Sequence, residues 1–310
     1  MSLQELTRKP RVAKKPQVAI MNAVHDLPVL AARDLGFFKD EGLDIDFVTT
    51  PGMAQVTTSH FVKFDSVFDR PLDSAYNDGG IDQFRMCEWG IMKRAVESHE
   101  KGHRPAKIVA LGASMSMFAI AVARDSKFYE PEMLKNQPIA VTPNNGSHFT
   151  TLKMMEGFLA PEHVKTTSAG SMVKRLDALK QGKVAAVSLM EPWISVAQQQ
   201  GMRILIESHS TRSEAASDEL DGPTLAAMFR AQARAVELLE KDPTPFVHYF
   251  VAETGGLLDA KDFQAWRLLH APPQPYTRER FDDEYNWTVK WNMTVPGATY
   301  ENTVDNRAWE

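Results

Sequence analysis

Four residues of the sequence combine a side chain that can attack a substrate or move a proton with a position near an expected ligand site. His25 can donate a hydrogen bond to a carboxylate or sulfonate, or transfer a proton near neutral pH. Cys87 is the only cysteine, and a nearby cation such as Arg85 or His60 would favour its nucleophilic thiolate form. Glu88 follows directly and can act as a general acid or base. We therefore predict His25, His60, Cys87 and Glu88 as the catalytic candidates.

Each of these side chains also has an ordinary structural role open to it. His25 can belong to a helix-capping loop, Cys87 can be a small buried hydrophobe, and Glu88 can be a solvated charge. His60 and Arg70 fall in one long polar segment, where they can form a base and a carboxylate clamp or remain solvated charges. The residue types leave both alternatives open.

A polar turn after an apolar run predicts an anion site. Residues 138–141 read as a buried strand, and residues 144–148 follow it with the sequence NNGSH before a helix. The free N–H groups and the dipole of a helix N-terminus favour a negative charge. Ser147 can instead be an ordinary N-cap. We expect ligand contacts from Asn145, Ser147 and His148.

Further contacts are expected after other strands, because ligands of parallel α/β sheets bind beyond the carboxyl ends of the strands. Trp89 and Trp193 can stack on a flat ligand, although tryptophans more often anchor cores. The predicted ligand-binding residues are Asn22, Arg70, Trp89, Asn145, Ser147, His148, Glu191 and Trp193.

The elements that must hold these residues alternate along the chain. Apolar runs of strand length and amphipathic helical stretches follow one another, which predicts an α/β fold with mainly parallel sheets. The polar stretch 207–222 has no periodicity and reads as a linker. The predicted strands are 18–21, 43–48, 108–111, 118–122, 138–141, 185–189 and 204–206. The predicted helices are 27–35, 91–98, 148–159, 172–180, 194–200 and 224–239, with a turn at 37–42.

The length of 310 residues favours two lobes over one core. We predict that residues 17–123 with 208–310 form lobe 1 and that residues 124–207 form lobe 2, with a cleft between them. A hydrophobic content of 43% and a charged content of 24% are typical of soluble globular proteins.

Charge and motifs exclude several classes of partner. The net charge of −5 supplies no basic field for nucleic acid or anionic lipid, and no apolar run of 18 residues predicts membrane insertion. A single cysteine excludes an internal disulfide and a cysteine-built zinc site. Because no HExxH, P-loop, GxGxxG or calcium-loop motif occurs, we predict no metal and no cofactor.

The first 17 residues are basic and polar, without the apolar core of a secretory signal. This favours a cytoplasmic location. The alternative is a periplasmic protein whose leader has been removed.

Three segments carry a resemblance to a known family. They are residues 31–45, residues 176–193 with the EPW sequence at Glu191, and residues 287–307. They resemble the solute-binding proteins of taurine, sulfonate and nitrate ABC importers and the thiamin-pyrimidine precursor synthases of the same fold. The resemblance implies a type II, two-lobed solute-binding-protein fold.

Two enzyme branches of this fold can be compared residue by residue. The thiamin-precursor synthases carry a cysteine-rich loop and a lysine that holds pyridoxal phosphate, whereas residues 85–90 here contain only Cys87. The cytoplasmic sulfinate desulfinases are similar around His60 and Gly79, but they use a cysteine after the first strand, where this chain has Ala23 or a neighbour and no cysteine.

We predict a cytoplasmic enzyme that acts on a small aromatic or heterocyclic acid by lyase-type or hydrolytic chemistry. The absence of an export signal and the number of titratable side chains near the expected cleft favour it. One alternative is a receptor that passes a small anion, such as a sulfonate, nitrate or pyrimidine precursor, to an ABC permease. Another is a sensor without catalysis.

Overall fold

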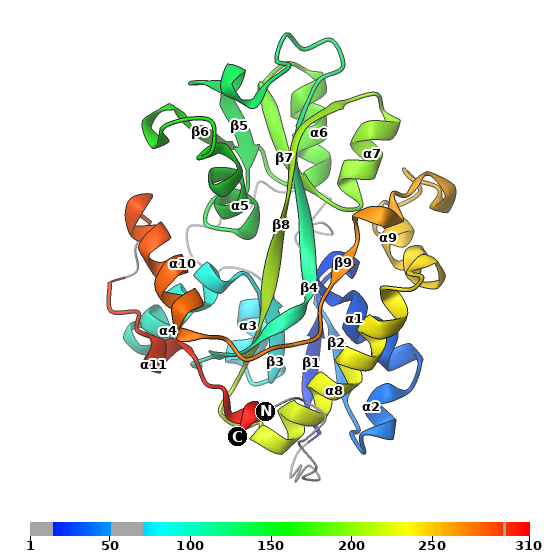
Figure 1. The fold of residues 1–310 in the computed structure, drawn as a ribbon, viewed down its shortest axis with the longest axis vertical. Coiled ribbons are helices and arrows are strands. Elements are labelled where there is room, and N and C mark those ends of the chain that lie inside the picture. The colour runs from blue at the N-terminus through cyan, green and yellow to red at the C-terminus, as the bar shows by residue number, and fades with distance from the viewer. Residues whose placement is uncertain (1–14, 51–70, 294–295) are drawn as a thin grey trace.

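The computed structural model of the chain describes residues 15–50, 71–293 and 296–310. In these residues a nine-stranded sheet has the order β2-β1-β3-β8-β4-β7-β5-β6, and β9 pairs with β4 (Figure 1). The strands are β1 Gln17–Ile20, β2 Asp46–Thr49, β3 Gln83–Met86, β4 Lys107–Val122, β5 Pro138–Val141, β6 Lys165–Ser168, β7 Ala186–Met190, β8 Arg203–Ala216 and β9 Leu269–His270.

Helices surround the strands at both ends of the molecule (Figure 1). They are α1 Ala23–Asp34, α2 Phe37–Asp40, α3 Pro71–Asn77, α4 Glu88–Lys101, α5 Gly146–Met155, α6 Met172–Lys180, α7 Trp193–Gln199, α8 Gly222–Leu239, α9 Val247–Glu253, α10 Arg278–Lys290 and α11 Tyr300–Thr303. Among the described helices, none combines the length and apolarity needed to cross a bilayer.

Two long strands run through the middle of the molecule. β4 and β8 pair antiparallel from Lys107 with Ala216 to Val122 with Arg203, and the other elements gather at their two ends (Figure 1). We call the group around β1, β2 and β3 lobe 1 and the group around β5, β6 and β7 lobe 2. The α/β, two-lobed fold class is confirmed. The exact division predicted at residues 123 and 207 stays a prediction.

Strand pairing within each lobe is parallel, as predicted, but pairing through the long strands is not. β1 pairs parallel with β2 and β3, and β5 pairs parallel with β6 and β7. β4 leaves lobe 1 for lobe 2 and β8 returns, so these two strands run antiparallel to each other. The expectation of mainly parallel sheets was therefore only half right.

Several predicted elements need correction. Residues 108–111 and 118–122 belong to one strand, β4, and the predicted linker 207–222 is strand up to Ala216. The predicted turn 37–42 contains the short helix α2. The buried residues of β8 include Ser210, Arg212 and Glu214, whose polar side chains hide the apolar alternation that usually reveals a strand.

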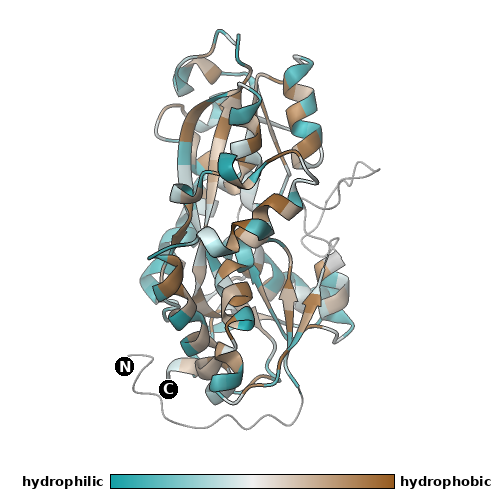
Figure 2. Ribbon diagram, turned by 90° about the vertical axis from the view of Figure 1, so that its right-hand side faces the viewer, coloured by the Kyte–Doolittle hydropathy of each residue, from teal (hydrophilic) through white to brown (hydrophobic). Residues whose placement is uncertain are grey.

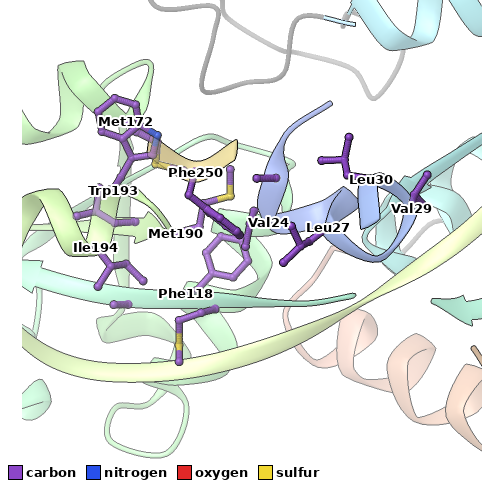
Figure 3. Close-up of a cluster of buried hydrophobic side chains, with 14 of the residues drawn as sticks. Val24, Leu27, Val29, Leu30, Phe118, Met172, Met190, Trp193, Ile194 and Phe250 are labelled. Atoms are coloured by element: carbon purple, nitrogen blue, oxygen red, sulfur yellow. The ribbon is translucent and has the colours of Figure 1, made fainter. Parts of the chain in front are cut away.

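The apolar core continues from one lobe into the other. One cluster of buried side chains joins α1 and α8 to β4, β7 and α7. In Figure 3, Val24 and Leu27 of α1 lie beside Phe118 of β4 and Met190 of β7. Figure 2 shows hydrophobic and hydrophilic residues interspersed along the helices, as expected when one face of each helix is buried.

Candidate functional site

The site is centred on Arg212, a β8 residue whose guanidinium group is buried between the lobes. Arg212 is only 3% exposed. Its Nε donates to Ser116 Oγ of β4 at 2.9 Å, while its Nη2 has no hydrogen-bond partner among the described residues. The described residues also supply no ion-pair partner for it. Leaving a buried charged N–H unsatisfied costs at least about 1–3 kcal/mol, so this group is suited to accept an anion.

The guanidinium lies against the first residue of α5, in lobe 2. A Cβ built on Gly146 would fall 2.9 Å from Arg212 Nη1, which is closer than real Cβ contacts. Only glycine therefore fits here without displacing the arginine. The positive end of the α5 dipole adds to the charge of Arg212 at the same place.

The turn before α5 excludes the alternative in which Ser147 is the N-cap. Asn145 is the N-cap, and its side chain accepts a hydrogen bond from Ser147 N at 3.4 Å. Ser147 is the second residue of the helix and not its cap, because the turn is completed at Asn144, which has a φ of 51°. The Ser147 hydroxyl accepts from Thr142 N at 3.0 Å.

A second buried guanidinium, Arg175 of α6, lies beneath this turn. Its Nη2 donates to the hydroxyls of Thr142 and Ser147, the latter at 3.4 Å, and its Nη1 donates to Ser188 O at 2.6 Å. No carboxylate of the described residues pairs with it, and burial lowers its pKa to about 9. Arg212 of the interlobe strand β8 and Arg175 of lobe 2 are thus two buried cations without acidic partners among the described residues.

Lobe 1 faces Arg212 with Cys87 and Glu88. Burial lowers the pKa of Arg212, and the charges of Cys87 and Glu88 oppose this, so both groups lie within electrostatic reach of it. Cys87 is 4% exposed and is the N-cap residue of α4, at the positive end of that helix. Two predicted catalytic residues therefore lie close enough to the guanidinium of Arg212 to interact with its charge.

Glu88 is already held by strong partners. Arg280 of α10 donates to both of its oxygens, from Nε at 2.8 Å and from Nη2 at 2.7 Å, and the Tyr276 hydroxyl donates as well. This two-point ion pair fixes the start of α4 against α10. A role of Glu88 in acid–base chemistry stays a prediction, and its contacts are those of a positioning group.

The residues predicted to form a loop after β1 are instead the start of α1. Asn22 is the N-cap and accepts from His25 N at 3.0 Å. Asp26 accepts from Asn22 N at 3.0 Å, and Glu253 of α9 accepts from Ala23 N. With Asn22 as its cap, the helix begins four residues before the predicted start at residue 27. Carboxylates of the chain itself therefore occupy this helix N-terminus.

Buried acids lie beneath α1. Arg85 Nε pairs with Asp26, and its Nη1 lies 3.4 Å from Glu214 of β8. Burial raises the pKa of Glu214 to about 7 and that of Glu253 to about 8, and the charge of Asp26 adds to both shifts. Buried carboxyl groups with raised pKa values therefore lie beneath α1, while Arg212 and Arg175 place positive charge at the turn before α5.

His25 is anchored through its backbone. Its carbonyl accepts a hydrogen bond from Ser114 Oγ at 2.6 Å, which fixes the first turn of α1 to β4 two residues before Ser116. Its place in the first helical turn, and not in a loop, corrects the prediction. A catalytic role for it stays a prediction.

The remaining predicted contacts are engaged by neighbours in the chain. Trp89 donates to Glu284 at 2.8 Å and stacks on Phe149 with ring centres 4.8 Å apart. His148 Nδ1 accepts from Asn144 N at 3.3 Å, and burial lowers its pKa to about 4, so the ring is neutral near pH 7.

Two more predicted contacts lie at the end of β7. Glu191 accepts from Ser195 N at 3.2 Å and from Arg267 at 3.3 Å, and burial raises its pKa to about 7. Trp193 begins α7, and its indole N–H has no partner among the described residues. The predicted His60 and Arg70 lie outside the described residues, as does any contact they make.

Sequence patterns missed Arg212, Ser116 and Arg175. Arg212 fell in the supposed linker, and Arg175 looked like a surface residue of an amphipathic helix. One signal could have revealed the strand that contains Arg212. Small and charged residues alternate after residues 204–206, which is a period of two. Within the described residues, no group of three or more histidine, cysteine or acidic side chains is placed to bind a metal.

Comparison with known proteins tests the fold. No protein-family model and no curated protein sequence matches the chain. The alkanesulfonate-binding protein SsuA from Xanthomonas axonopodis pv. citri, bound to MOPS, matches with a TM-score of 0.68 and 16% identity over 92% of this chain and 96% of that chain. The nitrate-binding protein NrtA from Synechocystis PCC 6803 matches with a TM-score of 0.66 and 13% identity, over 97% and 88%.

The chain has the solute-binding-protein fold. The desulfurization enzyme DSZB shares it, with a TM-score of 0.58 and 13% identity over 94% of this chain and 97% of that chain. The predicted fold family is therefore confirmed. At such low identities the likeness shows the fold alone, and the solute-binding-protein fold is common to receptors and enzymes.

Proposed function

We propose that this solute-binding-protein fold binds a small organic anion between its lobes, with Arg212 as the residue that holds the negative charge. The observation that carries the proposal is the unpartnered Nη2 of a buried guanidinium set against the start of α5. An anion there would gain charge-assisted hydrogen bonds, each worth about 1.5–3 kcal/mol.

The charge distribution around Arg212 supports an oxyanion headgroup. Arg175 adds a second positive charge beneath the same turn, and neither cation has an acidic partner in the described parts of the chain. A planar guanidinium fits a carboxylate, sulfonate or sulfinate at two points. Two proteins of the same fold are named for alkanesulfonate and nitrate, which are anions of this kind.

The experiment compares an anion with a neutral compound of the same shape. Calorimetry should show ethanesulfonate or benzenesulfonate binding at least about tenfold more tightly than the corresponding methyl sulfone, because only the anion compensates the buried charge. Equal affinities for the anion and the neutral sulfone would refute the proposal.

A second candidate function, an enzyme acting on the bound acid, rests on Cys87. Its thiol lies at the α4 N-terminus and within electrostatic reach of Arg212, which is where a nucleophile would meet a substrate anchored by its acid group. Lyase-type or hydrolytic chemistry and a cytoplasmic location belong to this candidate. Delivery to an ABC permease belongs to the receptor alternative.

Alkylation separates these candidates at Cys87. If the thiol faces the ligand, iodoacetamide should modify the folded protein, and bound benzenesulfonate should slow the reaction, because the ligand lies between reagent and sulfur. Mass spectrometry gives an unambiguous count, since the chain has one cysteine. If iodoacetamide modifies Cys87 only after the protein is unfolded, Cys87 does not face the ligand. That result would favour the receptor alternative.

A further inference from the structure

A cavity with a volume of about 240 Å³ lies between α4, α5 and α10. Its apolar lining includes Trp89 and Met92 from α4, Phe149 from α5, Tyr285 from α10 and Met293 just beyond α10. The stacked rings of Trp89 and Phe149 form a flat aromatic wall. Aromatic rings and methionine sulfur favour contact with another ring.

This cavity differs from the anion site in its residues and in its charge. Arg212, Cys87 and Gly146 do not line it. Lys93, which does, lies 3.5 Å from Glu97 in an ion pair along α4. The other nearby cation, Lys153, is paired with Glu284 at 2.5 Å. Both cations are compensated, so the cavity has no excess positive charge to attract an anion.

Two asparagine amides supply the polar part of the lining. Asn144 precedes α5 and Asn292 follows α10, with φ values of 51° and 54° in the left-handed region that asparagine tolerates. Neither side-chain amide hydrogen-bonds to another described residue. Thr288, in contrast, donates to Tyr285 O at 2.7 Å. The two amides can each donate and accept, which suits a neutral polar substituent.

The volume limits the size of the occupant. It lies below the ~300–1,000 Å³ of pockets that hold drug-sized ligands. One ring with a short substituent fills such a space.

We propose that this cavity is a second binding site, distinct from the anion site, for a neutral single-ring aromatic or heteroaromatic molecule that carries an amide or hydroxyl group. The ring packs against the Trp89–Phe149 wall, and the substituent hydrogen-bonds to Asn144 and Asn292. Because the walls come from both lobes and from α10, the bound molecule also strengthens the contact between the lobes.

Benzamide is the probe, with cyclohexanecarboxamide as its non-aromatic match. Ligand-detected NMR and calorimetry on the full chain should show benzamide binding at millimolar or lower concentration, more tightly than cyclohexanecarboxamide, and raising the melting temperature. Ala298→Phe places a ring in the cavity and should weaken benzamide binding at least about tenfold, since it removes the space that the ring fills.

A second variant tests the polar contact without changing the packing. Asn292→Gly keeps the left-handed backbone and removes the amide, and it should weaken benzamide binding by about 2- to 12-fold, the equivalent of one hydrogen bond. Ethanesulfonate binding should be the same in both variants as in the wild type, which separates this test from that of the anion site.

Any one of three results would overturn the second site. The wild-type protein would bind no benzamide at millimolar concentration, or Ala298→Phe would bind benzamide as tightly as the wild type. Alternatively, the wild type would bind benzamide and cyclohexanecarboxamide with equal affinity. Ala298→Phe gives no answer if circular dichroism shows that it does not fold. In that case, unchanged benzamide affinity in Asn292→Gly is enough to refute the hydrogen bond between benzamide and Asn292.

Discussion

Arg212 owes its position to the small residues around it. Ser116 takes one of its N–H groups, and Gly146 leaves room for the rest of the guanidinium at the start of α5. A buried cation is stable only when its charge is compensated, and an incoming anion supplies that compensation. Affinity at this site should therefore depend on the placement of the guanidinium as well as on its charge.

Gly146→Ala tests this placement. The added methyl group would lie 2.9 Å from Nη1, so the guanidinium must move, and we expect anion affinity to fall about tenfold while the fold persists. Calorimetry with ethanesulfonate measures the change. Gly157→Ala is the matched control, because nothing lies within 4 Å of its added methyl group. An equal effect of both substitutions would contradict the role assigned to Gly146.

At the residue scale, prediction from sequence succeeded where polar residues follow an apolar strand. The turn at Asn145 and Ser147 was found because β5 before it is purely apolar. Arg212 was missed because it lies within a strand whose buried face is itself polar. Residues that break the local pattern to serve a site are the hardest to predict for that reason.

At the scale of elements, α10 connects the two lobes. Its Arg280 pairs with Glu88 of α4, and its Glu284 pairs with Lys153 of α5 (Figure 1). Trp287 and Lys290 of α10 also donate to Glu156, just beyond α5. These contacts join the start of α4 and the end of α5 to α10.

Arg280→Met should destabilise the protein by about 2–4 kcal/mol, because it leaves the buried Glu88 carboxylate without its cation. The lower part of this range allows for solvent at Arg280, which is one-third exposed. Urea unfolding followed by tryptophan fluorescence measures the loss. Arg278→Met is the control, because its pair with Glu301 is exposed to solvent and should contribute little to stability. Similar losses of stability in both variants would contradict the role of the Glu88–Arg280 ion pair in joining α4 to α10.

Short elements with regular patterns were predicted well, and long-range pairings were not. β5 and α6 have the predicted bounds, since each is a short run with clear periodicity. The pair between Glu88 and Arg280 joins residues 192 positions apart and leaves no local signal in the sequence. β4 was divided in two because Ser114 and Ser116, which serve the site, interrupt its apolar run.

At the scale of the whole molecule, short segments of the sequence were enough to predict the fold. Residues 31–45 span the end of α1, α2 and the approach to β2, a connection whose length and turns constrain how the chain can fold. Their resemblance to solute-binding proteins was enough to predict two lobes. The same likeness leaves the ligand open, because ligand contacts come from residues that differ within one fold.

The buried acids of lobe 1 should make stability depend on pH. Burial raises the pKa of Glu214 to about 7 and that of Glu253 to about 8, above the ordinary value of 4.5. Between about pH 4.5 and pH 8, these two carboxyl groups hold more protons in the folded protein than in the unfolded chain. The free energy of unfolding should therefore fall as the pH rises through this range.

Urea unfolding across this pH range measures the slope. Glu253→Gln cannot lose a proton and should flatten the curve, whereas Glu237→Gln, at an exposed position, should leave it unchanged. Stability that rises with pH over the same interval would show that these carboxyl groups are charged in the folded state.

The most direct test of the account is the affinity of Arg212→Gln for an organic anion. Calorimetric titration of wild type, Arg212→Gln and Arg234→Gln with benzenesulfonate makes the comparison, Arg234 being an exposed arginine paired with Asp40. We expect Arg212→Gln to lose at least about tenfold in affinity, because a charge-assisted hydrogen bond is worth about 1.5–3 kcal/mol, and Arg234→Gln to match the wild type. Wild-type affinity in Arg212→Gln, with the fold intact, would contradict an anion site at Arg212.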